Sequence, residues 1–188
     1  MSTSSQEKLR IEVRIYGLRG IVPDIDKSIQ LFKAFIGKPL GVSKPDSNTV
    51  YRLPLVLSPY ETLYLCEKGL IEPILNGQVI DCKALQKHFE SLVPDFTKRY
   101  AVFADLTQKG YILRGAMKYG ADFAVYELGP GLEHAPYVVT VASSNTRLRA
   151  VDIVGLGRLS HSVRKKSVLA IVDDKGIVSY IVFKWVKI

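Results

Sequence analysis

The clearest structural signal in the chain is Lys166-Ser-Val-Leu-Ala-Ile-Val172, followed by Asp173-Asp-Lys-Gly176 and then Ile177-Val-Ser-Tyr-Ile-Val-Phe-Lys-Trp-Val186. The first and last of these segments are apolar and rich in β-branched and aromatic residues, which favour strands. The middle segment is polar and ends in glycine, which is typical of a hairpin turn. The sequence therefore predicts two strands joined as a hairpin.

Strand and helix signals alternate in the residues before this hairpin. Strands are predicted over 111–117, 121–127 and 136–141, between a helix over 94–108 and a helix over 146–162. This order of helix, three strands, helix and two strands indicates a sheet with helices packed on it. We expect a carboxyl-terminal domain of that kind over residues 95–188.

The first half of the chain predicts a separate, smaller α/β domain over residues 1–94. Its strand and helix signals are short. In chain order they are a strand over 9–15, a loop over 37–48, a strand over 49–57, a helix over 58–69, a hairpin turn at Asn76-Gly77 and a helix over 81–92. Residues 26–36 are compatible with either helix or strand. The helix that follows Ser58 has the best-defined start, because Pro59 suits a first turn and Glu61 completes a capping box.

Composition narrows the class of protein. Apolar residues make up 47% of the 188 residues and charged residues 23%, as in a globular domain. There is no apolar run of the roughly 20 residues that cross a bilayer, and the polar start lacks the core of a signal peptide. We therefore expect a cytoplasmic protein.

The net charge of +8 suits a polyanionic partner such as RNA, because neutralising phosphates releases counterions. Within 144–166 only Asp152 opposes six basic residues, which are Arg147, Arg149, Arg158, Arg164, Lys165 and Lys166. Such a stretch is also common on solvated surfaces that bind nothing.

No metal or cofactor site is expected. A metal site needs about four closely spaced cysteine, histidine or carboxylate ligands, and this chain has two isolated cysteines and three scattered histidines. We interpret Cys66 and Cys82 as small buried apolar groups. The sequence leaves a disulfide between them open.

Three segments carry residue types that could cleave RNA without a metal. The attacking 2′-hydroxyl must lose a proton, the leaving 5′ oxygen must gain one, and the phosphorane needs a cation beside it. Histidine suits proton transfer near neutral pH, lysine suits the phosphorane, and tyrosine can orient the hydroxyl or relay its proton if nearby cations lower its pKa. The segments are 118–126, 133–139 and 160–172.

Together these segments resemble the tRNA-intron endonuclease family, in its archaeal form. The resemblance is carried by Lys118-Tyr-Gly-Ala-Asp-Phe123 with Tyr126, by Glu133-His134 before an apolar strand, and by His161-Ser-Val-Arg-Lys-Lys166 before another. It covers about residues 95–188, and the first half matches in length and around 57–70. It implies a nuclease-like carboxyl-terminal domain.

The resemblance also implies an active site. Tyr126, His134 and Lys165 match the family's catalytic residues, whereas Tyr119 does not match the tyrosine. It implies metal-independent cleavage of precursor tRNA at a bulge-helix-bulge, leaving a 2′,3′-cyclic phosphate and a 5′-hydroxyl. We assign Lys165 to the phosphorane, favour His134 as general acid and give Tyr126 the 2′-hydroxyl, while which residue takes that proton stays open.

Three further residues are expected to contact RNA. Arg158 and Trp185 fall where relatives hold a bulged base between a cation and an aromatic ring. Lys44 precedes a proline in the loop 37–48, which has little apolar material to bury and should be exposed and mobile. We expect Lys44 to bind a phosphate, although a solvated surface lysine explains it equally well.

The assembly and the rival functions stay open from the sequence. Two cuts need two active sites, which a homodimer, a homotetramer and a two-plus-two heterotetramer with a homologous structural subunit all provide; we favour the heterotetramer, as in the crenarchaeal branch. The rival functions are a non-catalytic subunit of the same enzyme, a plain RNA-binding module and a metal-dependent nuclease.

Overall fold

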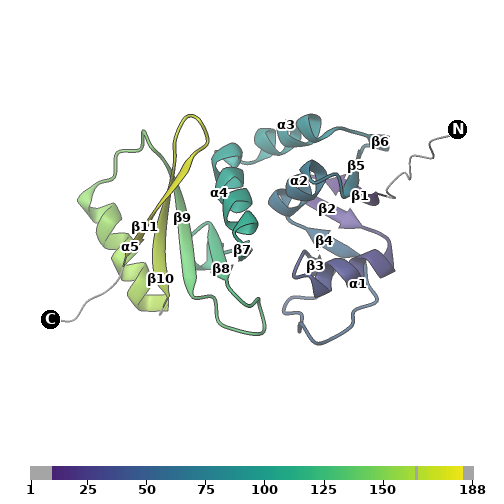
Figure 1. The fold of residues 1–188 in the computed structure, drawn as a ribbon, viewed down its shortest axis with the longest axis horizontal. Coiled ribbons are helices and arrows are strands. Elements are labelled where there is room, and N and C mark those ends of the chain that lie inside the picture. The colour runs from purple at the N-terminus through teal and green to yellow at the C-terminus, as the bar shows by residue number, and fades with distance from the viewer. Residues whose placement is uncertain (1–9, 164, 184–188) are drawn as a thin grey trace, which may run out of the picture. The chain divides into compact units, whose positions relative to one another are not determined.

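The computed structural model describes residues 10–163 and 165–183, without the side chains of 160–163. The chain divides between Val93 and Pro94 into two compact units, each with its own sheet (Figure 1). Both sheets mix parallel and antiparallel strands and carry helices, so the expected mixed α/β class is confirmed.

The first unit is built on a six-stranded sheet. Its strand order is β3-β4-β2-β1-β5-β6, and β1 pairs with β5 in parallel while the other pairs are antiparallel. The elements are β1 (Ile11–Tyr16), β2 (Arg19–Val22), α1 (Ile25–Lys33), β3 (Lys38–Pro39), β4 (Leu55–Leu57), α2 (Pro59–Glu67), β5 (Ile71–Leu75), β6 (Gln78–Val79) and α3 (Cys82–Leu92). Alternate residues of β1 are buried, which explains why this strand was readable from the sequence.

The capping box at the start of α2 is present, and its glutamate has a second task. The Ser58 side chain accepts from the Glu61 backbone, and Glu61 Oε2 accepts from the Ser58 backbone at 2.8 Å. Its other oxygen, Oε1, accepts from the Gly37 backbone, also at 2.8 Å. One buried carboxylate therefore caps a helix and fastens the start of the loop that carries Lys44.

One expectation for the first unit is corrected, and one segment that the sequence left open is assigned. The strand expected over 49–57 is only Leu55–Leu57. Thr49 instead closes a turn onto the Asp46 carbonyl, and Pro54 has no N–H to offer a neighbouring strand. Of the ambiguous residues 26–36, those up to Lys33 belong to helix α1, which starts at Ile25 because the Asp24 side chain caps it.

The two cysteines are not free apolar thiols, which corrects our interpretation of them. Cys66 near the end of α2 and Cys82 at the start of α3 form a disulfide that closes a loop of 16 residues. The bond ties the two helices together at a point where the intervening chain forms the β5–β6 hairpin.

The second unit is built on a five-stranded sheet with the order β11-β10-β9-β8-β7. Its elements are α4 (Phe96–Gln108), β7 (Ile112–Gly115), the short 3-10 helix η1 (Met117–Tyr119), β8 (Phe123–Tyr126), β9 (Tyr137–Ser143), α5 (Ala150–Val163), β10 (Lys166–Val172) and β11 (Val178–Phe183). Strands β9 and β10 are parallel, so α5 is the crossover between them, while the other pairs are antiparallel.

Helices α4 and α5 cover opposite faces of this sheet (Figure 1). Phe123 of β8 packs against Phe103 of α4, whereas its neighbour Ala124 belongs to a cluster that Leu159 of α5 packs against. Successive residues of a strand point to opposite faces, so β8 serves both helices. The side chain of Tyr126 lies on the same face as that of Ala124.

The elements of the second unit begin and end close to the predicted positions. Helix α5 starts at Ala150 rather than 146, because the Asp152 side chain accepts from the Arg149 backbone and caps the helix there. The predicted hairpin is β10–β11, although residues 184–186 of its second strand lie outside the described residues. In the described ranges 10–163 and 165–183, no helix is long and apolar enough to span a membrane.

Candidate active site

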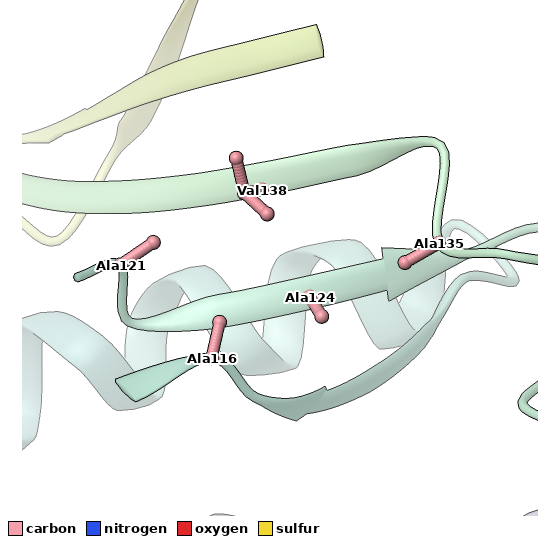
Figure 2. Packing of buried hydrophobic residues seen from close by; sticks show 5 residues of the cluster. All are labelled: Ala116, Ala121, Ala124, Ala135 and Val138. Carbon is pink, nitrogen blue, oxygen red and sulfur yellow. The ribbon is translucent and has the colours of Figure 1, made fainter. Parts of the chain in front are cut away.

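A cluster of small buried side chains forms the floor of the candidate site. It consists of Ala116, Ala121, Ala124, Ala135 and Val138 (Figure 2). Figure 2 shows Ala135 beside the end of the strand that carries Ala124, so the start of the β9 segment lies against the end of β8. Alanines leave room for larger groups, and the rings of Tyr119 and Tyr126 pack against this cluster.

Tyr126, the last residue of β8, is half-buried. Burial raises the pKa of its phenol above the ordinary value of 10.0, and so does the neighbouring Tyr119. Lys118 and Arg114 act in the opposite direction and do not offset these effects. The lowered pKa that a proton relay would require is therefore absent from the free chain, and Tyr126 is a neutral phenol at neutral pH.

Lys165 approaches the same floor from the start of β10. Its Nζ donates a hydrogen bond of 2.7 Å to the carbonyl oxygen of Ala135, the residue that follows His134. The same Nζ lies 5.9 Å from the centre of the Tyr119 ring, at the outer limit of a cation–π contact. Strand pairing explains the meeting, because Lys166 pairs with Tyr137 in the parallel β9–β10 ladder.

His134 is exposed in the loop between β8 and β9. Two glycines with positive φ, Gly129 at 125° and Gly131 at 94°, shape this loop. Glu133 turns its side chain back across the loop, and its Oε1 accepts from the backbone of Glu127 at 2.5 Å and of Leu128 at 2.7 Å. The residue before His134 is thus bonded to the residue after Tyr126.

Asp122, the aspartate of the 118–123 motif, forms hydrogen bonds with two neighbouring elements. Asp122 Oδ1 accepts from Arg99 Nε of α4, and Oδ2 accepts from the Val141 backbone of β9, both at 2.7 Å. The Asp122 backbone N–H also donates to the Val139 carbonyl. This side chain therefore links α4 to β9 from a position directly before β8.

The structure brings the three expected catalytic residues to one end of one sheet. The expected RNA-binding residues do not form one group. Arg158 is exposed on α5 and lines a pocket of about 740 Å³ that Tyr119 also lines. Lys44 is exposed in the first unit, between β3 and β4. Trp185 lies outside the described residues.

Sequence reasoning did not assign a role to Tyr119, Glu133 or the alanine cluster. Tyr119 was set aside because Tyr126, and not Tyr119, matches the family's tyrosine. The four alanines at 116, 121, 124 and 135 are a visible signal, since small residues in the neighbourhood of a motif mark places where other groups pack closely. In the part of the chain that the structure describes, no three histidine, cysteine or carboxylate side chains gather as a metal site would require.

Fold and site together define a two-unit protein whose second unit carries a tyrosine, a histidine and a lysine at one end of its sheet. Two domains of one protein family match the chain, one in each half. The tRNA intron endonuclease N-terminal domain matches residues 11–85, and the tRNA intron endonuclease catalytic C-terminal domain matches residues 96–180.

Similar proteins occur in several archaea. The chain is 44% identical over 181 residues to a tRNA-splicing endonuclease of Saccharolobus islandicus, 44% over 180 to one of Saccharolobus solfataricus and 42% over 180 to one of Sulfolobus acidocaldarius. These alignments cover 94–95% of this chain and 99% of each relative. The chain belongs to the tRNA intron endonuclease family.

Proposed function

We propose that this chain is the catalytic subunit of a tRNA-splicing endonuclease that cleaves precursor tRNA at bulge-helix-bulge intron boundaries. The observation that carries the proposal is the bond between Lys165 Nζ and the carbonyl oxygen of Ala135, the residue that follows His134. Tyr126 packs on the alanine cluster that includes Ala135. Lys165 and Tyr126 thus both contact this small floor, and His134 directly precedes Ala135 in the chain.

In the proposed reaction the ribose 2′-oxygen attacks the adjacent phosphorus, and the bond from phosphorus to the 5′ oxygen breaks. The 2′-hydroxyl gives up its proton and the 5′ oxygen receives one, so the products are a 2′,3′-cyclic phosphate and a 5′-hydroxyl. Lys165 stabilises the negative charge on the phosphorane. Because a side chain supplies this cation, the proposed reaction does not depend on a metal.

The proposed proton transfers follow the exposure and pKa of the groups. His134, which is exposed to an incoming strand, is the general acid for the 5′ oxygen. Tyr126 positions the 2′-hydroxyl by hydrogen bonding, since its raised pKa keeps the phenol protonated. The group that accepts the 2′-proton is not assigned.

The pocket beside Arg158 supports a role in RNA binding. Its walls combine cationic, aromatic and apolar groups, among them Lys98, Tyr119, Leu156 and Arg158. An unstacked base needs a flat partner and a cation nearby. We include Arg158, Lys44 and Trp185 in the proposal as RNA contacts, and a homologous structural subunit as the partner in a two-plus-two heterotetramer.

The proposal is tested with a bulge-helix-bulge RNA in excess EDTA, using the full-length chain alone and together with a structural subunit of the family. We expect two cuts, each leaving a cyclic phosphate. His134→Ala and Lys165→Ala should lower the cleavage rate about 100- to 1000-fold while RNA binding changes little. Lys166→Ala, one residue along, is the control for lost charge.

The outcomes separate the rival functions. Binding without cleavage by the wild-type chain in either form would indicate a structural subunit or an RNA-binding module. Cleavage that disappears in EDTA and returns with magnesium, with the RNA kept folded, would indicate a metal-dependent nuclease. Near-normal rates in both alanine variants would contradict the assignment of the site.

A further inference from the structure

The loop between β8 and β9 separates two of the proposed catalytic residues and is closed by one side chain. Tyr126 ends β8, and His134 stands eight positions later, just before the β9 segment. A loop with two glycines in positive φ has many alternative conformations when nothing constrains it. The relative position of the phenol and the imidazole therefore depends on what constrains this loop.

Glu133 supplies that constraint. Its Oε1 accepts from two successive backbone N–H groups, those of Glu127 and Leu128, which directly follow Tyr126. The loop also bonds within itself, since the backbone N–H groups of Leu132 and Glu133 both point to the Gly129 carbonyl. The side chain thus closes the loop from the position next to His134 onto the position next to Tyr126.

The charge state of Glu133 fits this role. Hydrogen bonds from the backbone of Leu128, and then of Glu127 and Gly129, hold the pKa of this carboxyl below its ordinary value of 4.5. A lowered pKa means that the contribution to loop stability is present above pH 4.5 and is lost as the pH falls through the lowered value. Glu133 is therefore an anionic acceptor throughout the neutral range.

We propose that Glu133 is a positioning residue, which acts by clasping the 127–133 loop so that Tyr126 and His134 face the same phosphate. This inference rests on the proposed function for its effect on cleavage, although the clasp itself is a property of the loop. Misplacing a reacting group by about 1 Å can lower a rate by up to about 100-fold. Substrate binding, which depends on many contacts elsewhere, should change much less.

The experiment compares Glu133→Ala with Glu127→Ala at pH 7 in the full-length chain, assembled in the form that cleaves. Glu127 is the matched control, because it lies on the same loop and its replacement by alanine removes the same negative charge. Its carboxylate does not close the loop but accepts a hydrogen bond from the Tyr137 hydroxyl at 3.1 Å. We expect Glu133→Ala to lower kcat tenfold or more with KM changed less than twofold. Glu127→Ala should keep kcat within twofold.

A conservative variant and a direct readout complete the test. Glu133→Gln keeps an oxygen acceptor of the same reach, so its kcat should lie between those of wild type and Glu133→Ala at an unchanged melting temperature. Amide exchange followed by NMR should show protected N–H groups at Glu127 and Leu128 that lose protection in Glu133→Ala. If Glu133→Ala does not fold, Glu133→Gln decides by the same two measurements.

The two proposals fail in distinguishable ways. A wild-type chain that never cleaves RNA would overturn the proposed function, and the amide exchange would still decide whether the clasp exists. A wild-type chain that cleaves, with unchanged kcat in Glu133→Ala and Glu133→Gln, would overturn the positioning role. Equal losses in Glu133→Ala and Glu127→Ala would assign the effect to charge and would also overturn it.

Discussion

At the scale of single residues, the surroundings of Tyr126 decide the protonation state of its phenol. A tyrosine with cations nearby is easily taken for an ionisable base, yet burial and Tyr119 raise its pKa more than Lys118 and Arg114 lower it. Tyr119 has a different environment, with the ammonium groups of Lys118 and Lys165 4.7 and 5.9 Å from its ring centre. The phenol of Tyr126 is therefore suited to donate a hydrogen bond, and the ring of Tyr119 to hold lysines.

This difference predicts distinct effects of removing each hydroxyl. Tyr126→Phe should lower the cleavage rate about tenfold or more, because the proposed role of Tyr126 is to bind the 2′-hydroxyl through its own hydroxyl. Tyr119→Phe keeps the ring and should cleave at a nearly normal rate. Tyr119→Leu removes the ring that Lys165 contacts and should therefore cleave more slowly. Single-turnover rates at saturating enzyme measure all three. Equal losses in the two phenylalanine variants would contradict the assignment.

The raised pKa also predicts a pH profile. A phenol with a pKa above 10.0 stays protonated as the pH rises to 9, so Tyr126 contributes no ionisation to the rate below pH 9. The rates of wild type and Tyr126→Phe should therefore rise and fall with pH in parallel between pH 5 and 9. A limb of the profile that the variant loses would instead indicate that Tyr126 acts as a base.

At the scale of elements, the first unit depends on two cross-links between segments that are distant in sequence. Glu61 joins the cap of α2 to Gly37, and Gly37 has a φ of 68° and no room for a side chain, since an added Cβ would lie 2.6 Å from Leu55. The disulfide joins α2 to α3. Both cross-links lie outside the unit that carries the proposed catalytic residues.

Removing the disulfide should therefore cost stability without affecting the chemistry. Closing a loop of 16 residues constrains the unfolded chain and stabilises the fold by about 3 kcal/mol. The double variant Cys66→Ser with Cys82→Ser should lose about that much free energy of unfolding by chemical denaturation. Its cleavage rate at a temperature where it stays folded should match wild type. A folded variant that does not cleave would refute this expectation.

The loop that carries Lys44 shows local order around an exposed lysine. Lys38 Nζ donates to the Ser43 carbonyl at 2.6 Å, and the Tyr51 hydroxyl accepts from the Asp46 backbone at 2.9 Å, while the Tyr51 ring packs edge-on against Phe32. Lys44 lies between these two anchors and stays exposed. The loop can thus present this lysine at little further entropic cost.

If Lys44 contacts one phosphate, its removal should reduce the salt dependence of RNA binding. Lys44→Ala should weaken binding, and the slope of log affinity against log salt concentration should shrink by roughly one. Lys87→Ala, which removes an exposed lysine of α3, is the control for a general loss of charge. An unchanged slope in Lys44→Ala, or equal changes in both variants, would place Lys44 in solvent.

At the scale of the whole molecule, each chain carries one proposed active site, which sets the minimum number of copies of the chain in the assembly. An intron has two ends, so excising it in one complex takes two copies of Tyr126, His134 and Lys165. We predict that the chain forms a heterotetramer with two copies of a structural subunit. Native mass spectrometry of the chain alone and with that subunit checks this, and full cleavage activity of a homotetramer would show it to be wrong.

Local sequence determined much of this protein. Ser58 and Glu61 specify the start of α2, and Asn76-Gly77 specifies a hairpin turn whose φ values of 51° and 80° both lie in the left-handed region. Such signals depend only on neighbouring residues, so they can be read along the chain. The motifs of the second half likewise identified the family, which the comparisons confirmed.

Only the tertiary structure decided which residues meet. Lys165 bonds to a carbonyl 30 positions away because β9 and β10 pair in parallel, and no local pattern states that register. The disulfide likewise depends on how α2 and α3 pack, and the raised pKa of Tyr126 depends on burial by residues that other elements supply. Burial and contact are properties of the folded chain in space, whereas caps and turns are properties of a few consecutive residues.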